Sequence, residues 1–131
     1  MVRTEEDLEQ QLERIGRALV KVGQGTYVVR LGPNRPMVAI RLSPPVLVMQ
    51  VAVGQVPPLD AEKSAKLYKT LLEFNAVGLV HAAYGLEGDT IVLSAAFELE
   101  SVDPNEMEAA LSDMDMALAE QVPQLRELAG G

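Results

Sequence analysis

Few side chains in this sequence have the chemistry of a catalyst or a metal ligand. The chain contains one histidine, His81, and no cysteine. His81 lies in the apolar run 79–84, without a second ligand or a nucleophile at a fixed spacing, and acid–base catalysis needs such a partner. We therefore predict that His81 is structural. The pattern leaves open whether its side chain is exposed.

Acidic residues near the C-terminus are the second candidate for chemistry. They are Asp113 and Asp115, together with Glu106, Glu108 and Glu120. Side chains two positions apart on a helix point about 160° from each other, so the two aspartates cannot share one metal ion. These acids predict a solvated helix face.

The loop 23–26 reads Gly-Gln-Gly-Thr and superficially resembles a phosphate cradle. It follows a helical pattern and precedes a strand, which is the reverse of a phosphate-binding loop. A turn is the prediction here. No catalytic residue, cofactor site or metal site is therefore predicted, and we expect a protein that is not an enzyme.

Length and charge exclude further classes of function. The 131 residues are 48% hydrophobic, which suits one domain with a single core. Nineteen acidic against eleven basic residues give a net charge of -8, and this charge repels a phosphate backbone. No apolar run approaches the roughly 18 residues that span a bilayer, and the N-terminus lacks a signal-peptide pattern. We expect a cytoplasmic protein that binds neither nucleic acid nor membrane.

The charges are unevenly distributed along the chain. No acid occurs between Glu13 and Asp60, an interval with six basic residues, whereas residues 103–127 carry seven acids and one arginine. Two explanations stay open. In the first, the basic and the acidic region attract different partners, or attract each other across a dimer. In the second, the charge serves only solubility.

Five strands and three helices are predicted to position these residues. A helix begins at the capping box of Thr4, carries Leu8, Leu12, Ile15 and Leu19 on one stripe, and ends at Gly23 and Gly25. Strands follow at 26–31, 37–42 and 46–53, with short connections that favour antiparallel pairing. The last of these runs is almost continuously apolar, which predicts a central strand covered on both faces.

The second helix is the most informative segment. It runs from the N-cap Asp60 to about Asn75. One apolar stripe contains Leu67, Leu71 and Phe74, and a second, about 120° around the helix, contains Ala61, Ala65, Tyr68 and Leu72. A single contact with a sheet needs only about a 100° arc. The surplus therefore predicts a second contact, with other elements of the chain or with a second copy.

A hairpin at 78–86 and 90–99 and a last helix from Asp103 complete the order. Pro104 favours the helix start, and Pro123 is expected to kink or end that helix. The prediction is an α+β fold, an antiparallel five-stranded sheet with three helices, in the order α-β-β-β-α-β-β-α.

This order, the segment Leu71-Leu72-Glu73-Phe74-Asn75, the hairpin after it and the acidic last helix resemble the type III secretion chaperones of the Tir-chaperone (CesT) type and the YbjN-like proteins. The resemblance covers nearly the whole chain and implies one chaperone-like domain over residues 1–131. In the secretion chaperones it implies a homodimer built around the second helix, and apolar patches that hold an extended segment of a client protein.

Carried over to this chain, the resemblance implies two alternative dimer contacts: Tyr68 with Leu72, or Leu67 with Leu71. It implies a client-binding surface at Val28, Val38 and Ile40, from their place in the first two predicted strands. The leading hypothesis is a non-enzymatic, dimeric protein-binding module that holds an extended client. The alternatives are a YbjN-like adaptor for a folded signalling partner, and an enzyme or ligand sensor whose site the sequence does not display.

Overall fold

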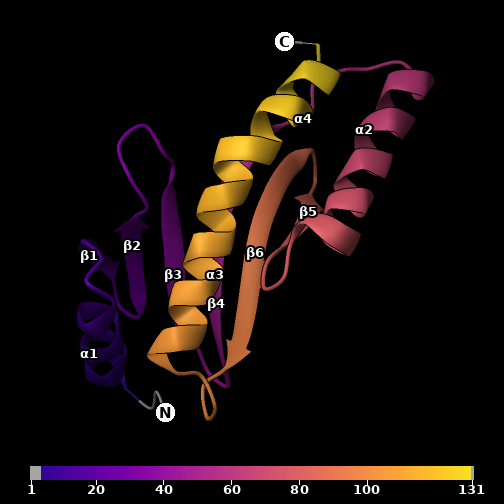
Figure 1. Cartoon of the computed structure of the whole chain (residues 1–131). Coiled ribbons are helices and arrows are strands. Elements are labelled where there is room, and N and C mark those ends of the chain that lie inside the picture. The colour runs from indigo at the N-terminus through magenta and orange to yellow at the C-terminus, as the bar shows by residue number, and fades with distance from the viewer. Residues whose placement is uncertain (1–3, 131) are drawn as a thin grey trace.

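The computed structural model describes residues 4–130, and its strands form one six-stranded antiparallel sheet in the order β1-β2-β3-β4-β6-β5. Figure 1 shows the arrangement. The strands are β1 (Leu19–Gly23), β2 (Thr26–Arg30), β3 (Met37–Ser43), β4 (Val46–Gln55), β5 (Ala83–Glu87) and β6 (Thr90–Glu98). The helices are α1 (Glu5–Ile15), α2 (Ala61–Glu73), α3 (Pro104–Met116) and α4 (Val122–Leu128), with π-helical turns η1 (Phe74–Gly78) and η2 (Ala117–Gln121).

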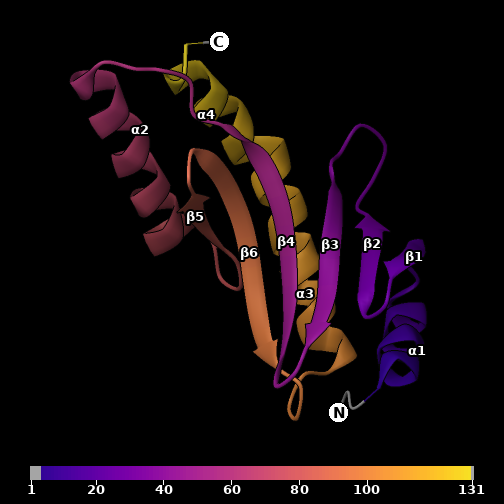
Figure 2. The same ribbon diagram turned by 180° about the vertical axis from the view of Figure 1, so that it is seen from behind.

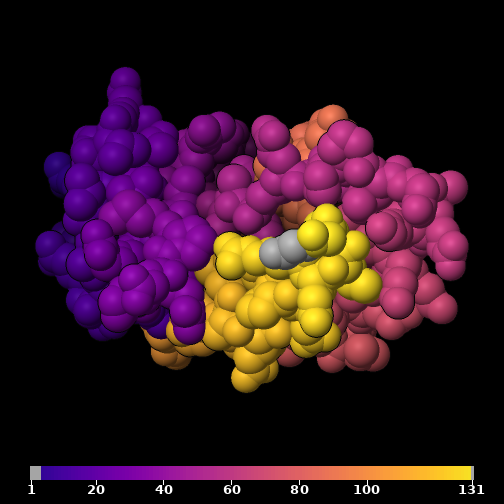
Figure 3. Space-filling model, turned by 90° about the horizontal axis from the view of Figure 1, so that it is seen from above, coloured from indigo at the N-terminus to yellow at the C-terminus, as the bar shows by residue number. Residues whose placement is uncertain are grey.

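The helices cover one face of the sheet and leave the other bare. α3 crosses one face and packs against α1, and Figure 2 shows no helix over the opposite face. α2 stands beside the edge strand β5 (Figure 1) and also packs against α4. Figure 3 shows, from above, the yellow C-terminal end of the chain against the magenta segment that contains α2. The sheet therefore has two edges, β1 and β5, each with a helix nearby.

The prediction of five strands was wrong by one, because the first helix is shorter than expected. α1 ends at Ile15, and its C-cap Gly16 adopts a left-handed conformation with φ 78°, which suits glycine. Leu19, placed by the stripe on the helix, instead begins β1 and pairs with Val29. The α+β class and the antiparallel arrangement are confirmed.

The predicted helix starts are confirmed by their caps. The side chain of Thr4 accepts a hydrogen bond from the backbone N–H of Asp7, which completes the capping box. Asp60 accepts one from Lys63, and Asp103 one from Glu106, both at 2.8 Å. Each cap satisfies a backbone donor that has no partner within the helix.

Pro123 does not stop the last helix. The chain widens into the π-helical turn η2 directly before it and then continues as α4. Because a proline lacks a backbone donor and crowds the preceding turn, a wider turn relieves that conflict. The helix therefore reaches α2 near the C-terminal end of the chain.

β4 is a central strand, as predicted, with β3 and β6 on either side. Its residues Leu47, Met49 and Val51 are buried in the core beneath the helices. The expectation that both faces of this strand are covered was wrong: Val46 and Val48 point to the bare face and are only half-buried. The apolar run of β4 thus leaves apolar surface without a cover from the described residues.

Candidate protein-binding surfaces

The bare sheet face is the first candidate surface, and it mixes small apolar side chains with polar ones. The register places Val20, Val28 and Ala39 in one row across β1, β2 and β3, and places Val48 beside Ala96. Polar and charged side chains share this face at Thr26, Arg30, Arg41, Gln50, Ser94 and Glu98. Exposed apolar sheet surface of this kind commonly marks a contact with another protein.

The three residues expected to bind a client fall on two different faces. Val38 and Ile40 are fully buried in the core, on the helix-covered face. Val28 lies on the bare face and is half-buried. Because neighbouring residues of a strand point to opposite sides, the sequence could place these residues on strands but could not say which face a partner would meet.

A second apolar surface lies between α2 and β5. It is a groove of about 250 Å³ lined by Tyr68, Leu71 and Leu72 of α2, Asn75 of η1, and Tyr84, Gly85 and Leu86 of β5. Tyr68 is 38% exposed and Leu72 68% exposed, whereas Leu67 and Leu71 are buried in the core. Ala61 and Ala65 are exposed on the same side as Tyr68. The chain's own elements therefore cover one of the two stripes of α2 and leave the other open.

The backbone edge of β5 next to this groove is occupied by a side chain. Asn75 Oδ1 accepts a hydrogen bond from the backbone N–H of Tyr84 at 2.6 Å, and Asn75 Nδ2 donates to the carbonyl oxygen of Tyr84 at 3.1 Å. One amide side chain thus makes the two bonds that a residue of a neighbouring strand would make. Strand pairing is blocked at Tyr84, the second residue of β5.

Tyr84 is held from its other end as well. Its hydroxyl donates a hydrogen bond to Gln121 Oε1 at 2.9 Å, and Gln121 Nε2 donates to the carbonyl oxygen of Gly78 at 3.1 Å. Burial raises the pKa of Tyr84, and the charge of Asp113 adds to the effect. The two π-helical turns, which carry Asn75 and Gln121, therefore meet at this one tyrosine.

Asp113 holds the connection that leads into β5. Its Oδ2 accepts hydrogen bonds from three successive backbone N–H groups, those of Val80, His81 and Ala82, at 2.9–3.1 Å. His81 itself is exposed. No group of three or more His, Cys, Asp or Glu side chains within residues 4–130 is placed to hold a metal ion. Asp113 acts here as a structural anchor, a role that the expected solvated face did not include.

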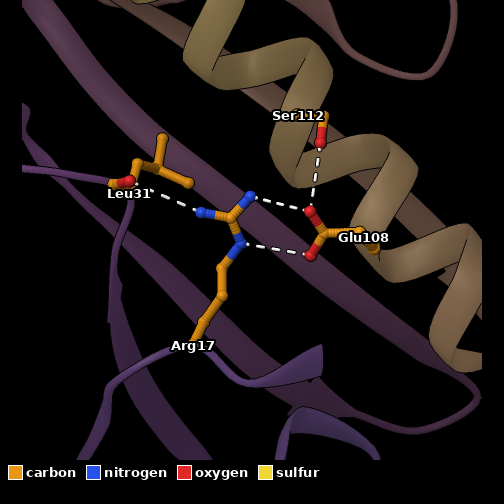
Figure 4. A network of polar contacts seen from close by, with 4 residues as sticks. All are labelled: Arg17, Leu31, Glu108 and Ser112. Carbon is orange, nitrogen blue, oxygen red and sulfur yellow. Dashed lines mark hydrogen bonds and ion pairs between the residues drawn. The ribbon is translucent and has the colours of Figure 1, made fainter. Parts of the chain in front are cut away.

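Basic residues of the N-terminal half form ion pairs with acidic residues of α3 within the same chain. Figure 4 shows Arg17, which follows α1, with its guanidinium making a two-bond ion pair to Glu108 of α3 at 2.8 and 3.1 Å. Arg35 pairs with Asp115 at 3.1 Å. Asp113 and Asp115 thus act on different sides of α3, as their spacing predicted. The guanidinium of Arg17 lowers the pKa of Glu108.

Sequence reasoning missed Asn75 and Asp113 as anchors. Asn75 was recognised only as a helix stop and Asp113 only as part of an acidic face. The bonds of both run to backbone groups of the segment 80–84, and backbone groups carry no residue-specific signal. Of these features, only the surplus apolar stripe of α2 could be recognised from the spacing of residues in the sequence.

Comparison with known proteins gives the family. The family model CesT_Tir_1 matches residues 1–130. A chain in the structure of the heterodimeric complex ExoU–SpcU, from the type III secretion system of Pseudomonas aeruginosa, is 19% identical with a TM-score of 0.62, covering 92% of this chain and 96% of that one. YbjN from E. coli is 16% identical with a TM-score of 0.59, covering 92% and 95%.

A search of curated proteins found no match. None of the helices in the part of the chain that the structure describes is long and apolar enough to span a membrane. The two structural relatives share the fold at low identity, and the family model covers nearly every residue. The predicted resemblance is confirmed: the chain belongs to the CesT_Tir_1 family, a family of chaperone-type, protein-binding proteins.

Proposed function

We propose that this protein is a non-enzymatic, dimeric chaperone that holds an extended segment of a client protein. The observation that carries the proposal is the bare, apolar sheet face in a chain of a chaperone-type family. Val28, Val48 and Ala96 lie on that face without a cover from residues 4–130. An extended segment can bury such a surface while its backbone pairs with a sheet edge.

The dimer contact is proposed at the groove between α2 and β5. Tyr68 and Leu72 are the exposed members of the helix, and Leu86 of β5, 46% exposed, extends their surface. Val77 and Val80, 88% and 85% exposed, lie on the segment between α2 and β5. A second copy that buries this apolar groove would remove the exposed side chains of Leu72 and Leu86 from water. Leu67 and Leu71 support the stripe from within the core.

Capture of the tagged chain from its native lysate tests the client-binding part. The wild type is compared with Val48→Glu, which puts a charge on the bare face, and with Ala119→Glu, which puts the same charge on an exposed site of η2. We expect one stoichiometric partner whose terminal segment is sufficient for binding. We expect Val48→Glu to lose it and Ala119→Glu to keep it.

Limited proteolysis of the captured partner distinguishes a chaperone from an adaptor. A held segment gains protection along a long stretch, whereas a folded partner gains it at a compact epitope. Protection at a compact epitope, or retention of the partner by Val48→Glu, would contradict the proposal.

Sedimentation equilibrium at micromolar concentration tests the dimer. Leu72→Glu should shift the protein toward the monomer mass by weakening association at least roughly tenfold, because a charge enters an apolar contact. Ala119→Glu serves again as the matched control and should leave the mass unchanged. A wild-type protein that is strictly monomeric would refute the dimer while leaving the client-binding proposal intact.

A further inference from the structure

The edge strand β1 has open backbone groups. The carbonyl oxygen of Ala18 accepts a hydrogen bond from the N–H of Arg30 at 3.3 Å, and Val20 is opposite Val28. Hydrogen-bonded and non-hydrogen-bonded pairs alternate in an antiparallel ladder, so Leu19 and Lys21 direct their backbone N–H and C=O groups away from β2. Within residues 4–130, no side chain caps them as Asn75 caps Tyr84.

A groove runs beside this open edge. It has a volume of about 560 Å³ and is lined by Glu6, Glu9, Gln10 and Glu13 of α1 and by Leu19 and Lys21 of β1. The two β1 residues in the lining are those with outward-directed backbone groups. A strand added to β1 would therefore lie in this groove, with α1 as its other wall.

The α1 wall is acidic and is not neutralised by the chain. Lys21 is already paired with Glu5, its Nζ lying 2.7 Å from Glu5 Oε2. No cation within the described residues forms an ion pair with Glu6, Glu9 or Glu13. Successive carboxylates are separated by roughly 4.5–6 Å along the helix, and alternate side chains of a strand by roughly 6.8 Å. The two spacings are close enough for alternate strand residues to face successive acids.

The buried side chain of Tyr27 lies next to the same edge. Tyr27 is opposite Lys21 in the register and is fully buried. Burial raises the pKa of Tyr27, and the charges of Glu9 and Glu5 add to the effect. Its hydroxyl therefore lies beside the acids of α1, and a cationic side chain that enters between β1 and α1 would meet the same negative charges.

From these observations we infer that the client segment that pairs with β1 carries basic side chains at alternate positions, facing Glu6, Glu9 and Glu13. The intervening side chains point to the bare sheet face, beside the exposed Val20, and are apolar. The inference rests on the proposed function and adds the chemistry of the client. β5 is less suited to this segment, because Asn75 occupies the backbone groups of Tyr84 and the neighbouring groove is lined mainly by apolar side chains.

Two short synthetic peptides test this chemistry: one alternates valine with lysine, and the other alternates valine with glutamate. Fluorescence anisotropy with the full chain should show binding of the lysine peptide at least roughly tenfold tighter than that of the glutamate peptide, because several exposed charge pairs add. The difference should shrink at about 1 M salt. Hydrogen exchange should slow at the amides of Leu19 and Lys21, and not at Leu86.

A glutamine variant isolates the acidic wall. Glu6, Glu9 and Glu13 are changed together to glutamine, which keeps the size and the helix preference. The matched control changes Glu62 and Glu73, exposed on α2 beside the other edge, to glutamine. We expect the first variant to lose the preference for the lysine peptide and the second to retain it.

Equal binding of both peptides, binding of neither, or protection at Leu86 in place of β1 would overturn the inference. The capture experiment decides the proposed function independently, since it uses the natural client. A client that is captured and that binds the α1 glutamine variant as tightly as the wild type would leave the proposed function standing and refute the basic client segment.

Discussion

The two edges of the sheet differ in how their backbone is treated. At β5, the side chain of Asn75 bonds to both backbone groups of Tyr84, and α2 stands alongside with apolar side chains. At β1, the outward groups of Leu19 and Lys21 face a groove with an acidic helix as its far wall. An open edge is a template for pairing with another chain. The β5 edge is thus capped at Tyr84 and has an apolar groove beside it, while the β1 edge has no side-chain cap from the described residues.

This difference separates two modes of association that would otherwise compete. A second copy that docks at α2 and β5 meets an apolar surface with a capped edge, so that it cannot continue the sheet past Tyr84. At β5 the backbone groups of Leu86 also point outward by the same alternation, but those of Tyr84 are occupied by Asn75. At β1 neither Leu19 nor Lys21 is capped by a side chain of the described residues, so a client strand has the longer open edge there. Continuous sheet growth from copy to copy needs two open edges, and Asn75 hinders it at β5.

Removal of Asp113 should have the largest effect, because Asp113 anchors the segment that leads into β5. Asp113→Ala leaves three backbone N–H groups without their acceptor. We expect a loss of about 3 kcal/mol in the free energy of unfolding, measured by urea denaturation. Asp115→Ala, two positions along α3, removes only the pair with Arg35 and should cost less than about 1 kcal/mol. Equal losses in the two variants would show that Asp113 is not the anchor.

Removal of Asn75 should convert the closed edge into an open one. Asn75→Ala eliminates both bonds to the backbone of Tyr84 and should lower the free energy of unfolding by about 2 kcal/mol. Hydrogen exchange should become faster at Tyr84 and stay unchanged at Leu19. Asn105→Ala, at an exposed helical site, is the control. An unchanged exchange rate at Tyr84 would argue against the capping role.

The ion pair between Arg17 and Glu108, near β1, should contribute about 1 kcal/mol to the free energy of unfolding. It consists of two hydrogen bonds, but both side chains are partly exposed to water. The hydrogen bond from Arg17 lowers the pKa of Glu108 below its ordinary value near 4.5. The contribution is therefore fully present above pH 4.5 and is lost as the pH falls through the lowered pKa.

Arg17→Met should accordingly destabilise the protein at neutral pH and reduce the slope of stability against pH below that range. Urea denaturation across the acid range measures both effects. A variant with the same acid slope as the wild type would show that the pair does not titrate as described.

The smallest expected effect comes from removing Lys21, which tests the acidic groove beside β1. Lys21→Met removes the cation that pairs with Glu5, and the pKa of Glu5, which Lys21 lowers, should rise. Because Lys21 is exposed and Glu5 is partly exposed to water, we expect no measurable change in melting temperature. The groove becomes more acidic overall, so the valine–lysine peptide should bind roughly twofold tighter. Weaker binding would place the basic segment elsewhere.

Local signals in the sequence predicted most of the fold. Thr4, Asp60 and Asp103 act as N-caps where their spacing predicted helix starts, because capping depends on residues within one turn. β1 was missed because the local pattern there was misleading. Leu19 continues the helical stripe of α1, and only pairing with β2 shows that the chain has already turned at Gly16.

The sequence predicted one feature of the candidate surfaces and left another undecided. The surplus apolar arc of α2 was visible in its periodicity, since the polar residues of that helix are confined to one side. The choice between Leu67 with Leu71 and Tyr68 with Leu72 could not be read, because both stripes are apolar. The position of the core decides that the first pair is buried.

The sequence by itself determined the helix starts, the central position of β4, the class of the fold and the surplus apolar stripe of α2, since each depends on neighbours along the chain. The tertiary structure alone decided that one sheet face stays bare, that Asn75 caps Tyr84 in β5, and that Glu6, Glu9 and Glu13 line an open edge. These features depend on how separate helices and strands pack together, and the periodicity within a single helix or strand does not encode that packing.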